Sequence, residues 1–207
     1  MESGNLSERE PNPAAFLEAC EIIDFRTPVV MQLAVQLKAE EINETVKRCF
    51  YLVRDEIKHS SDHKLNPVTC SASEVLRHRT GYCYAKSHLL CALLRANQIP
   101  AALCYQRLTI DGISAPYCLH GLNAVFLPEI GWYRLDPRGN RPDINAGFTP
   151  PQECLAFTTD LPGERNMPEL HAMPLPIVVS TLKKFDTWEA VLKNLPNVSE
   201  DKHAGGQ

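Results

Sequence analysis

Apolar positions recur every three or four residues through the first half of the chain, which is the spacing of one face of an α-helix. Residues 13–25 are compatible with a short helix that ends before Pro28. Residues 29–60 carry the pattern longest and predict one or two amphipathic helices with a solvated charged face. Ser71 and Glu74 have capping-box spacing, which predicts a short helix starting there.

The most apolar helix is predicted directly after Gly81, where the chain reads "GYCYAKSHLLCALLRANQIPA". Its apolar face consists mainly of four leucines, at Leu89, Leu90, Leu93 and Leu94. Asn97 is a plausible cap and Pro100 a stop signal, so the helix is expected to end between residues 96 and 100.

Beyond residue 100 the pattern changes to that of strands. Segments 101–110, 118–127 and 131–136 are rich in strand-forming residues, with turn signals at Asp111–Gly112 and at Pro128. Residues 137–176 contain many prolines and predict surface loops, with a short helix near 151–157. Strand character returns at 176–181, and a last helix is expected from Asp186, which has capping-box spacing to Glu189.

The order of helices followed by antiparallel strands predicts an α+β fold with the helices segregated to one side of the sheet. A chain of 207 residues is long enough for one domain with a substantial core. We expect a flexible leader at residues 1–13, a single domain at 14–198 and a disordered tail at 199–207.

Composition excludes several classes of partner. A net charge of −4 and the lack of a basic patch argue against nucleic acid, and no apolar run approaches the roughly 18 residues of a membrane span. The N-terminus has no signal-peptide pattern, and none of the eight cysteines forms a C-x-x-C pair. We therefore expect a cytoplasmic protein with free thiols, no membrane partner and no cofactor; its oligomeric state is left open.

Cys83 differs from the other seven cysteines in its position. It lies where the apolar helix begins, and the unpaired amides and dipole of a helix N-terminus stabilise a thiolate. Gly81 allows a sharp turn before it and close approach of a substrate. Packing alone is the competing interpretation, so a nucleophilic role requires a base nearby.

His120 is the histidine best placed to be that base, because it stands on an otherwise apolar strand. If residue 126 pairs with residue 132, His120 lies diagonal to Asp136 on one face of the sheet, within side-chain reach. The other histidines are less suitable. Four are expected to be exposed: His59, His63, His78 and His203. His88 faces away from the thiol, and His171 lies in the proline-rich region.

Three segments together resemble a known family. "GYCYAKSHLLCALLRANQIPA", "LHGLNAVFL" and "GWYRLDPRGN" are similar to the signature segments of the transglutaminase-like superfamily, and the resemblance covers residues 70–140. It implies a papain-like α+β core with the nucleophile at the start of a buried helix. It also implies a triad in which Cys83 is the nucleophile, His120 the base and Asp136 the orienting group. Leu122 and Ala124 depart from the aromatic and acidic residues that many relatives carry after the histidine.

The resemblance implies acyl transfer through a thioester on a peptide or protein substrate, and similarity to bacterial hydrolase-like members favours a cysteine protease-like hydrolase. Amine transfer onto glutamine and an inactive peptide-binding scaffold are the alternatives. A metal site formed by Cys83, Cys118 and His120 is a further rival, although no fourth ligand is indicated and we expect no metal. Four aromatic residues could line the cleft, but core packing is the preferred interpretation for each: Tyr82, Tyr84, Tyr105 and Trp132.

Overall fold

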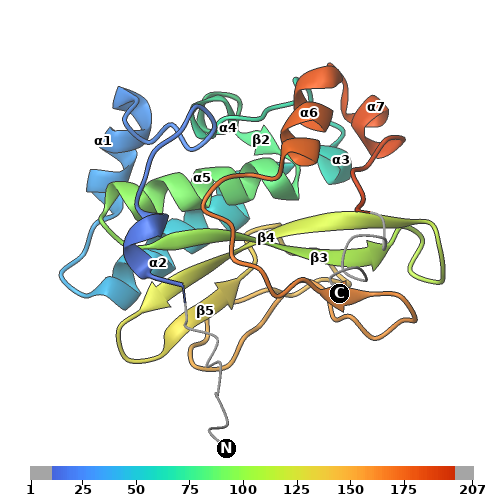
Figure 1. Cartoon of the computed structure of the whole chain (residues 1–207). Helices are drawn as coiled ribbons and strands as arrows, with labels where there is room; N and C mark the ends of the chain where they lie inside the picture. The colour runs from blue at the N-terminus through green and yellow to red at the C-terminus, as the bar shows by residue number, and fades with distance from the viewer. Residues whose placement is uncertain (1–10, 199–207) are drawn as a thin grey trace, which may run out of the picture.

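The computed structural model describes residues 11–198 and shows a layer of helices on one face of an antiparallel sheet (Figure 1). The four-stranded sheet has the order β5-β4-β3-β6. Its strands are β3 (Ala101–Thr109), β4 (Tyr117–Leu127), β5 (Gly131–Leu135) and β6 (Arg165–Asn166). The predicted α+β class, with helices gathered on one side, is confirmed.

The helix α5 (Cys83–Ala96) lies between the sheet and the other helices, and every residue from Cys83 to Arg95 is buried. Around it pack the helices α1 (Pro28–Leu37), α2 (Ile42–Tyr51) and α4 (Ala72–His78). The other elements of the described chain are the 3₁₀-helix η1 (Pro13–Phe16), the π-helix η2 (Leu52–Glu56), β1 (Lys58–His59), α3 (Ser60–His63), β2 (Thr80–Gly81), α6 (Pro176–Lys184) and α7 (Trp188–Leu192).

The strand register agrees with the sequence-based prediction. Phe126 pairs with Trp132, so Asp136 leaves β5 at the level of Leu122. Because β5 covers only one half of β4, the half containing His120 has no strand beside it on that edge. Helix α5 begins at this uncovered edge, which brings its first turn against the strand residue Gly121.

The predicted start of α4 is also confirmed. Ser71 accepts a hydrogen bond from the Glu74 amide while the Glu74 carboxylate accepts one from the Ser71 amide, forming the expected capping box. The long amphipathic pattern divides into α1 and α2, followed by one turn of π-helix.

Two expectations about helices are wrong, and a third is off by one residue. Pro28 begins α1 rather than ending a helix, because proline fits the first helical turn, where its missing N–H is not needed. No helix forms at 151–157, since Cys154 pairs with Gly147 and the Ala156 amide donates to Asp136. The last helix forms where it is expected, as α7, but Thr187 caps it in place of Asp186.

The segment predicted to be a strand at 176–181 forms α6 instead. Pro176 occupies its first turn and two lysines its last, both favourable for a helix. Val178 and Leu182, four residues apart, are buried in the main core. Tertiary packing therefore overrides the strand preference of the β-branched residues.

The proposed domain limits are only partly visible. Residues 1–10 of the expected leader and 199–207 of the expected tail lie outside the described residues. Within 11–198, no helix combines the length and the apolar character needed to cross a membrane.

Candidate active site

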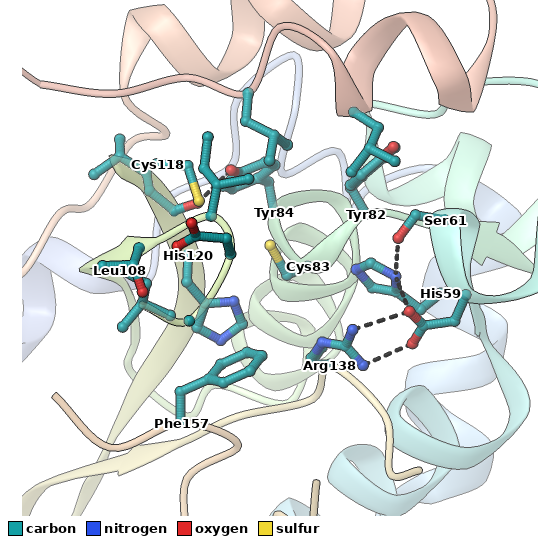
Figure 2. A pocket seen from close by; sticks show the side chains of 18 of the residues that line it. His59, Ser61, Tyr82, Cys83, Tyr84, Leu108, Cys118, His120, Arg138 and Phe157 are labelled. Atoms are coloured by element: carbon teal, nitrogen blue, oxygen red, sulfur yellow. Dashed lines mark hydrogen bonds and ion pairs between the residues drawn. The ribbon is translucent and has the colours of Figure 1, made fainter. Parts of the chain in front are cut away.

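Cys83 is the first residue of α5 and lies on the wall of a cavity of about 490 Å³ (Figure 2). The residue is 7% exposed and lines the cavity. Residue Tyr82 at the N-cap provides no side-chain hydrogen bond to the helix, which leaves first-turn amides available. The Gly121 amide lies 3.5 Å from Cys83 Sγ and donates toward it.

Two glycines permit this arrangement. A Cβ on Gly81 would come within 3.1 Å of Ala85 Cβ, in the first turn of α5. A Cβ on Gly121 would lie 2.9 Å from Tyr84 Cδ1 and 3.1 Å from its Cα. The helix start and the strand therefore approach each other more closely than a side chain on Gly121 would allow.

His120 and Asp136 lie together as the register predicts. His120 Nε2 is 2.7 Å from Asp136 Oδ2, and both side chains are almost fully buried. The Asp136 carboxylate also accepts hydrogen bonds from the Arg138 amide at 3.0 Å and the Ala156 amide at 3.2 Å. With Nε2 engaged by Asp136, the ring nitrogen Nδ1 is left for the thiol of Cys83.

Burial disfavours the charged forms of His120 and Asp136, but local interactions outweigh its effect on both pKa values. Burial alone would raise the pKa of Asp136, but the charge of His120, its hydrogen bond and the two amides hold that pKa below its usual value. Burial alone would lower the pKa of His120, but Asp136 and Cys83 raise it to about 10 through charge and hydrogen bonding. The geometry thus favours the charged imidazolium form of His120 beside the Asp136 carboxylate.

The charge on His120 predicts a pH dependence of stability. Its stabilising contribution is fully present below the unfolded pKa of about 6.5 and is lost as the pH rises through the folded value of about 10. The difference in unfolding free energy between wild type and His120→Asn should therefore shrink between pH 7 and pH 10. Denaturant titrations at several pH values would measure it, and a difference that stays constant would show that His120 is neutral.

The cavity wall on the other side of Cys83 contains His59, so the prediction that this histidine is exposed is wrong. It is 7% exposed and stands beside Cys83 because β1 pairs in parallel with β2, with His59 opposite Gly81. Its Nδ1 lies 3.1 Å from Ser61 Oγ. The two-residue strand is too short to show a period in the sequence, but a histidine two residues after the buried Ile57 was the available signal.

Arg138 links the two walls and was also not foreseen. Its guanidinium holds Asp62 through both carboxylate oxygens, at 2.7 and 3.0 Å, while its amide holds Asp136. It lies two residues after Asp136, in the segment where the sequence shows no period. Phe157, from the same proline-rich region, packs edge-on against His120 with ring centres 4.9 Å apart.

The expected aromatic residues divide into two groups. Tyr82 and Tyr84 line the cavity, whereas Tyr105 and Trp132 do not. Trp132 packs on Phe16 beside a second apolar cluster, which contains Leu122 and Ala124, the two residues that depart from the family pattern. Those departures therefore fill a core rather than the cavity.

Cys118 and His88 differ from Cys83 and His120 in their surroundings. Cys118 lines the cavity, but burial raises its pKa to about 12, so its thiol stays protonated near neutral pH. His88 is buried with Nδ1 2.8 Å from the Cys70 carbonyl oxygen, away from the thiol as expected. Within residues 11–198 no three histidine, cysteine or carboxylate side chains converge as metal ligands, so Cys83, Cys118 and His120 do not form the rival metal site.

The fold and the cavity define the class of protein to which the chain is similar. The family model of the transglutaminase-like superfamily matches residues 31–137, just over half of the chain, and the protein belongs to this superfamily. No curated protein matches this chain.

One solved structure shares the fold, and a second is similar in part. A "putative cysteine protease" from Cytophaga hutchinsonii superimposes with a TM-score of 0.50 and 20% identity over 63% of this chain and 43% of that one. The periplasmic domain of TgpA from Pseudomonas aeruginosa gives a TM-score of 0.45 and 20% identity over 61% of this chain and 48% of the domain. The matched part spans less than half the length of either structure.

Proposed function

We propose that the protein is a thiol-dependent acyl-transfer enzyme in which Cys83 is the nucleophile, His120 the acid and base, and Asp136 the orienting group. The observation that carries the proposal is the 2.7 Å contact between His120 and Asp136, beside a thiol at the start of a buried helix on the same cavity. Membership of a superfamily with thiol enzymes supports it.

The chemistry follows from these positions. The Cys83 thiolate attacks the carbonyl carbon of an amide, a C–S bond forms, and the carbonyl electron pair moves to oxygen. When the tetrahedral intermediate collapses, the C–N bond breaks and the His120 imidazolium gives its proton to the departing amine. The neutral imidazole then removes a proton from water, which attacks the thioester and releases a carboxylic acid and the thiolate.

We infer hydrolysis rather than amine transfer as the outcome. A transferase needs a site that holds the incoming amine, and carboxylates do line the cavity in the region 137–176, at Asp143 and Glu164. Both are already used, because Asp143 pairs with Arg141 and Glu164 accepts hydrogen bonds from Thr109. The description of the similar Cytophaga structure as a cysteine protease also favours a peptide or protein substrate.

Peptide products distinguish the two outcomes. Wild type and Cys83→Ala would be incubated with a complex peptide mixture and an excess of a fluorescent primary amine, and the products weighed by mass spectrometry. We expect new peptides ending in a free carboxylate with wild type and none with Cys83→Ala. Labelling with an amide-based thiol-reactive probe in the same two proteins would report the active thiol independently.

Predominantly amine-linked products at modest amine concentration would overturn hydrolysis and leave the three residues in their roles. A scaffold without activity is the second alternative, and it predicts no products and no selective labelling of Cys83. We retain the prediction of a bacterial, cytoplasmic enzyme that needs no cofactor as part of this proposal.

A further inference from the structure

His59 and His120 lie on two sides of Cys83 in the same cavity (Figure 2). Acyl transfer as proposed above uses only one of them. The backbone around His59 is anchored to α5. Lys86, buried on α5, donates hydrogen bonds to the carbonyl oxygens of Arg54 and Ile57, and Ile57 directly precedes β1. Strand β1 in turn pairs with β2, two residues before the thiol. The backbone that carries His59 is therefore held close to the first turn of α5.

The orientation of the His59 ring follows from its polar contacts. Nδ1 lies 3.1 Å from Ser61 Oγ and 3.6 Å from Asp62 Oδ1, and Asp62 is itself held by both nitrogens of Arg138. Among the described residues, Nε2 has no hydrogen-bond partner, and Figure 2 shows this nitrogen on the Cys83 side of the ring. One edge of the imidazole is anchored and the other faces the cavity.

His59 is the neutral histidine of the two. Burial, together with the positive charges of Arg138, Lys86 and His120, holds its pKa well below the usual value. A neutral imidazole carries one N–H and keeps it at the working pH. If the Ser61 hydroxyl donates to Nδ1, that N–H is on Nε2 and points at the cavity.

Attack by a thiolate places negative charge on the former carbonyl oxygen, close to the nucleophile. Fixed donors near that oxygen stabilise the transition state, and first-turn amides of α5 provide one set. We propose that His59 Nε2–H is the side-chain donor of this oxyanion site, an inference that rests on the proposed function. His59 is then a catalytic residue, and Ser61, Asp62 and Arg138 position it.

Two reactions of the same thiol separate this role from a structural one. Acylation of Cys83 by p-nitrophenyl acetate passes through an oxyanion, whereas alkylation by iodoacetamide does not. His59→Ala should slow the nitrophenolate burst about a hundredfold, the typical loss for one donor, and leave the alkylation rate unchanged. His59→Gln, which keeps an N–H donor on a side chain of similar reach, should recover most of the burst with the wild-type pH profile. His78→Ala, at an exposed histidine on α4, serves as the control.

Three other results would contradict the proposal. If His59→Ala slows both reactions equally, the residue acts on the thiol or on the fold, and the proposal is overturned. If His59→Gln fails to recover the burst and one limb of the pH profile is lost, His59 acts as a base, which also overturns it. If wild-type Cys83 is not acylated although it is alkylated, the proposed function fails, and this inference with it.

Discussion

Asp136→Asn should lower the rate of acyl transfer by about 10⁴-fold, the loss seen when the equivalent aspartate of a Ser-His-Asp triad is replaced. The carboxylate accepts hydrogen bonds from His120 Nε2 and from the amides of Arg138 and Ala156. Asparagine keeps one acceptor oxygen but presents an NH₂ group in place of the other. It can no longer stabilise an imidazolium, and it favours the wrong tautomer of His120.

The same substitution has a moderate effect on stability. An asparagine amide directed at a buried donor leaves a group unsatisfied, at a cost of about 1–3 kcal/mol. The variant should therefore unfold at a lower denaturant concentration but remain folded at 25 °C. Turnover and unfolding would be measured on the same preparation, with Asp143→Asn as the control, since Asp143 lines the same cavity but its side chain is 67% exposed. Full turnover in folded Asp136→Asn would remove Asp136 from the triad.

Gly121→Ala should damage both stability and activity. The new Cβ would lie 2.9 Å from Tyr84 Cδ1, 3.1 Å from Tyr84 Cα and 3.3 Å from Tyr84 N, and the last two are backbone atoms that cannot rotate away. Strand β4 and the first turn of α5 must then separate. Overpacking of this kind costs about 1–3 kcal/mol of unfolding free energy.

The effect on activity follows from the displacement of Cys83. The Gly121 amide donates to Sγ, and His120 is the preceding residue, so separation changes both contacts of the thiol. A misplacement of about 1 Å can cost on the order of a hundredfold in rate. Gly147→Ala is the matched control, because its nearest neighbour would be 3.7 Å away. Unchanged turnover in Gly121→Ala would show that the close approach is not required.

The parts of the site that lie on long periodic elements could be predicted from the sequence. The apolar pattern located the start of α5 and hence Cys83, and an assumed pairing of residue 126 with residue 132 placed His120 beside Asp136. These predictions succeeded because a long apolar run identifies the buried helix, and because a short turn containing Pro128 restricts how the two strands can pair.

The other wall could not be predicted, because its residues come from elements without a period. His59 is buried by a two-residue strand, and Phe157 and Arg138 reach the cavity from irregular segments. Their positions depend on contacts between distant parts of the chain, such as that of Arg138 with Asp62. The helix α6 was missed for a related reason, since its β-branched residues adopt a helix only because Val178 and Leu182 pack in the core.

The most direct test of the account is to identify which thiol forms the acyl-enzyme. The chain has eight cysteines, all within residues 11–198, and in this described part only Cys83 combines a helix start with a histidine–carboxylate pair. After brief treatment with p-nitrophenyl acetate at pH 7 and acid quenching, peptide mapping by mass spectrometry should find one acetyl group, on Cys83, and none in His120→Asn treated for the same time. Acetylation of another cysteine, or equal acetylation of Cys83 in His120→Asn, would contradict the assignment of Cys83 and His120 as nucleophile and base.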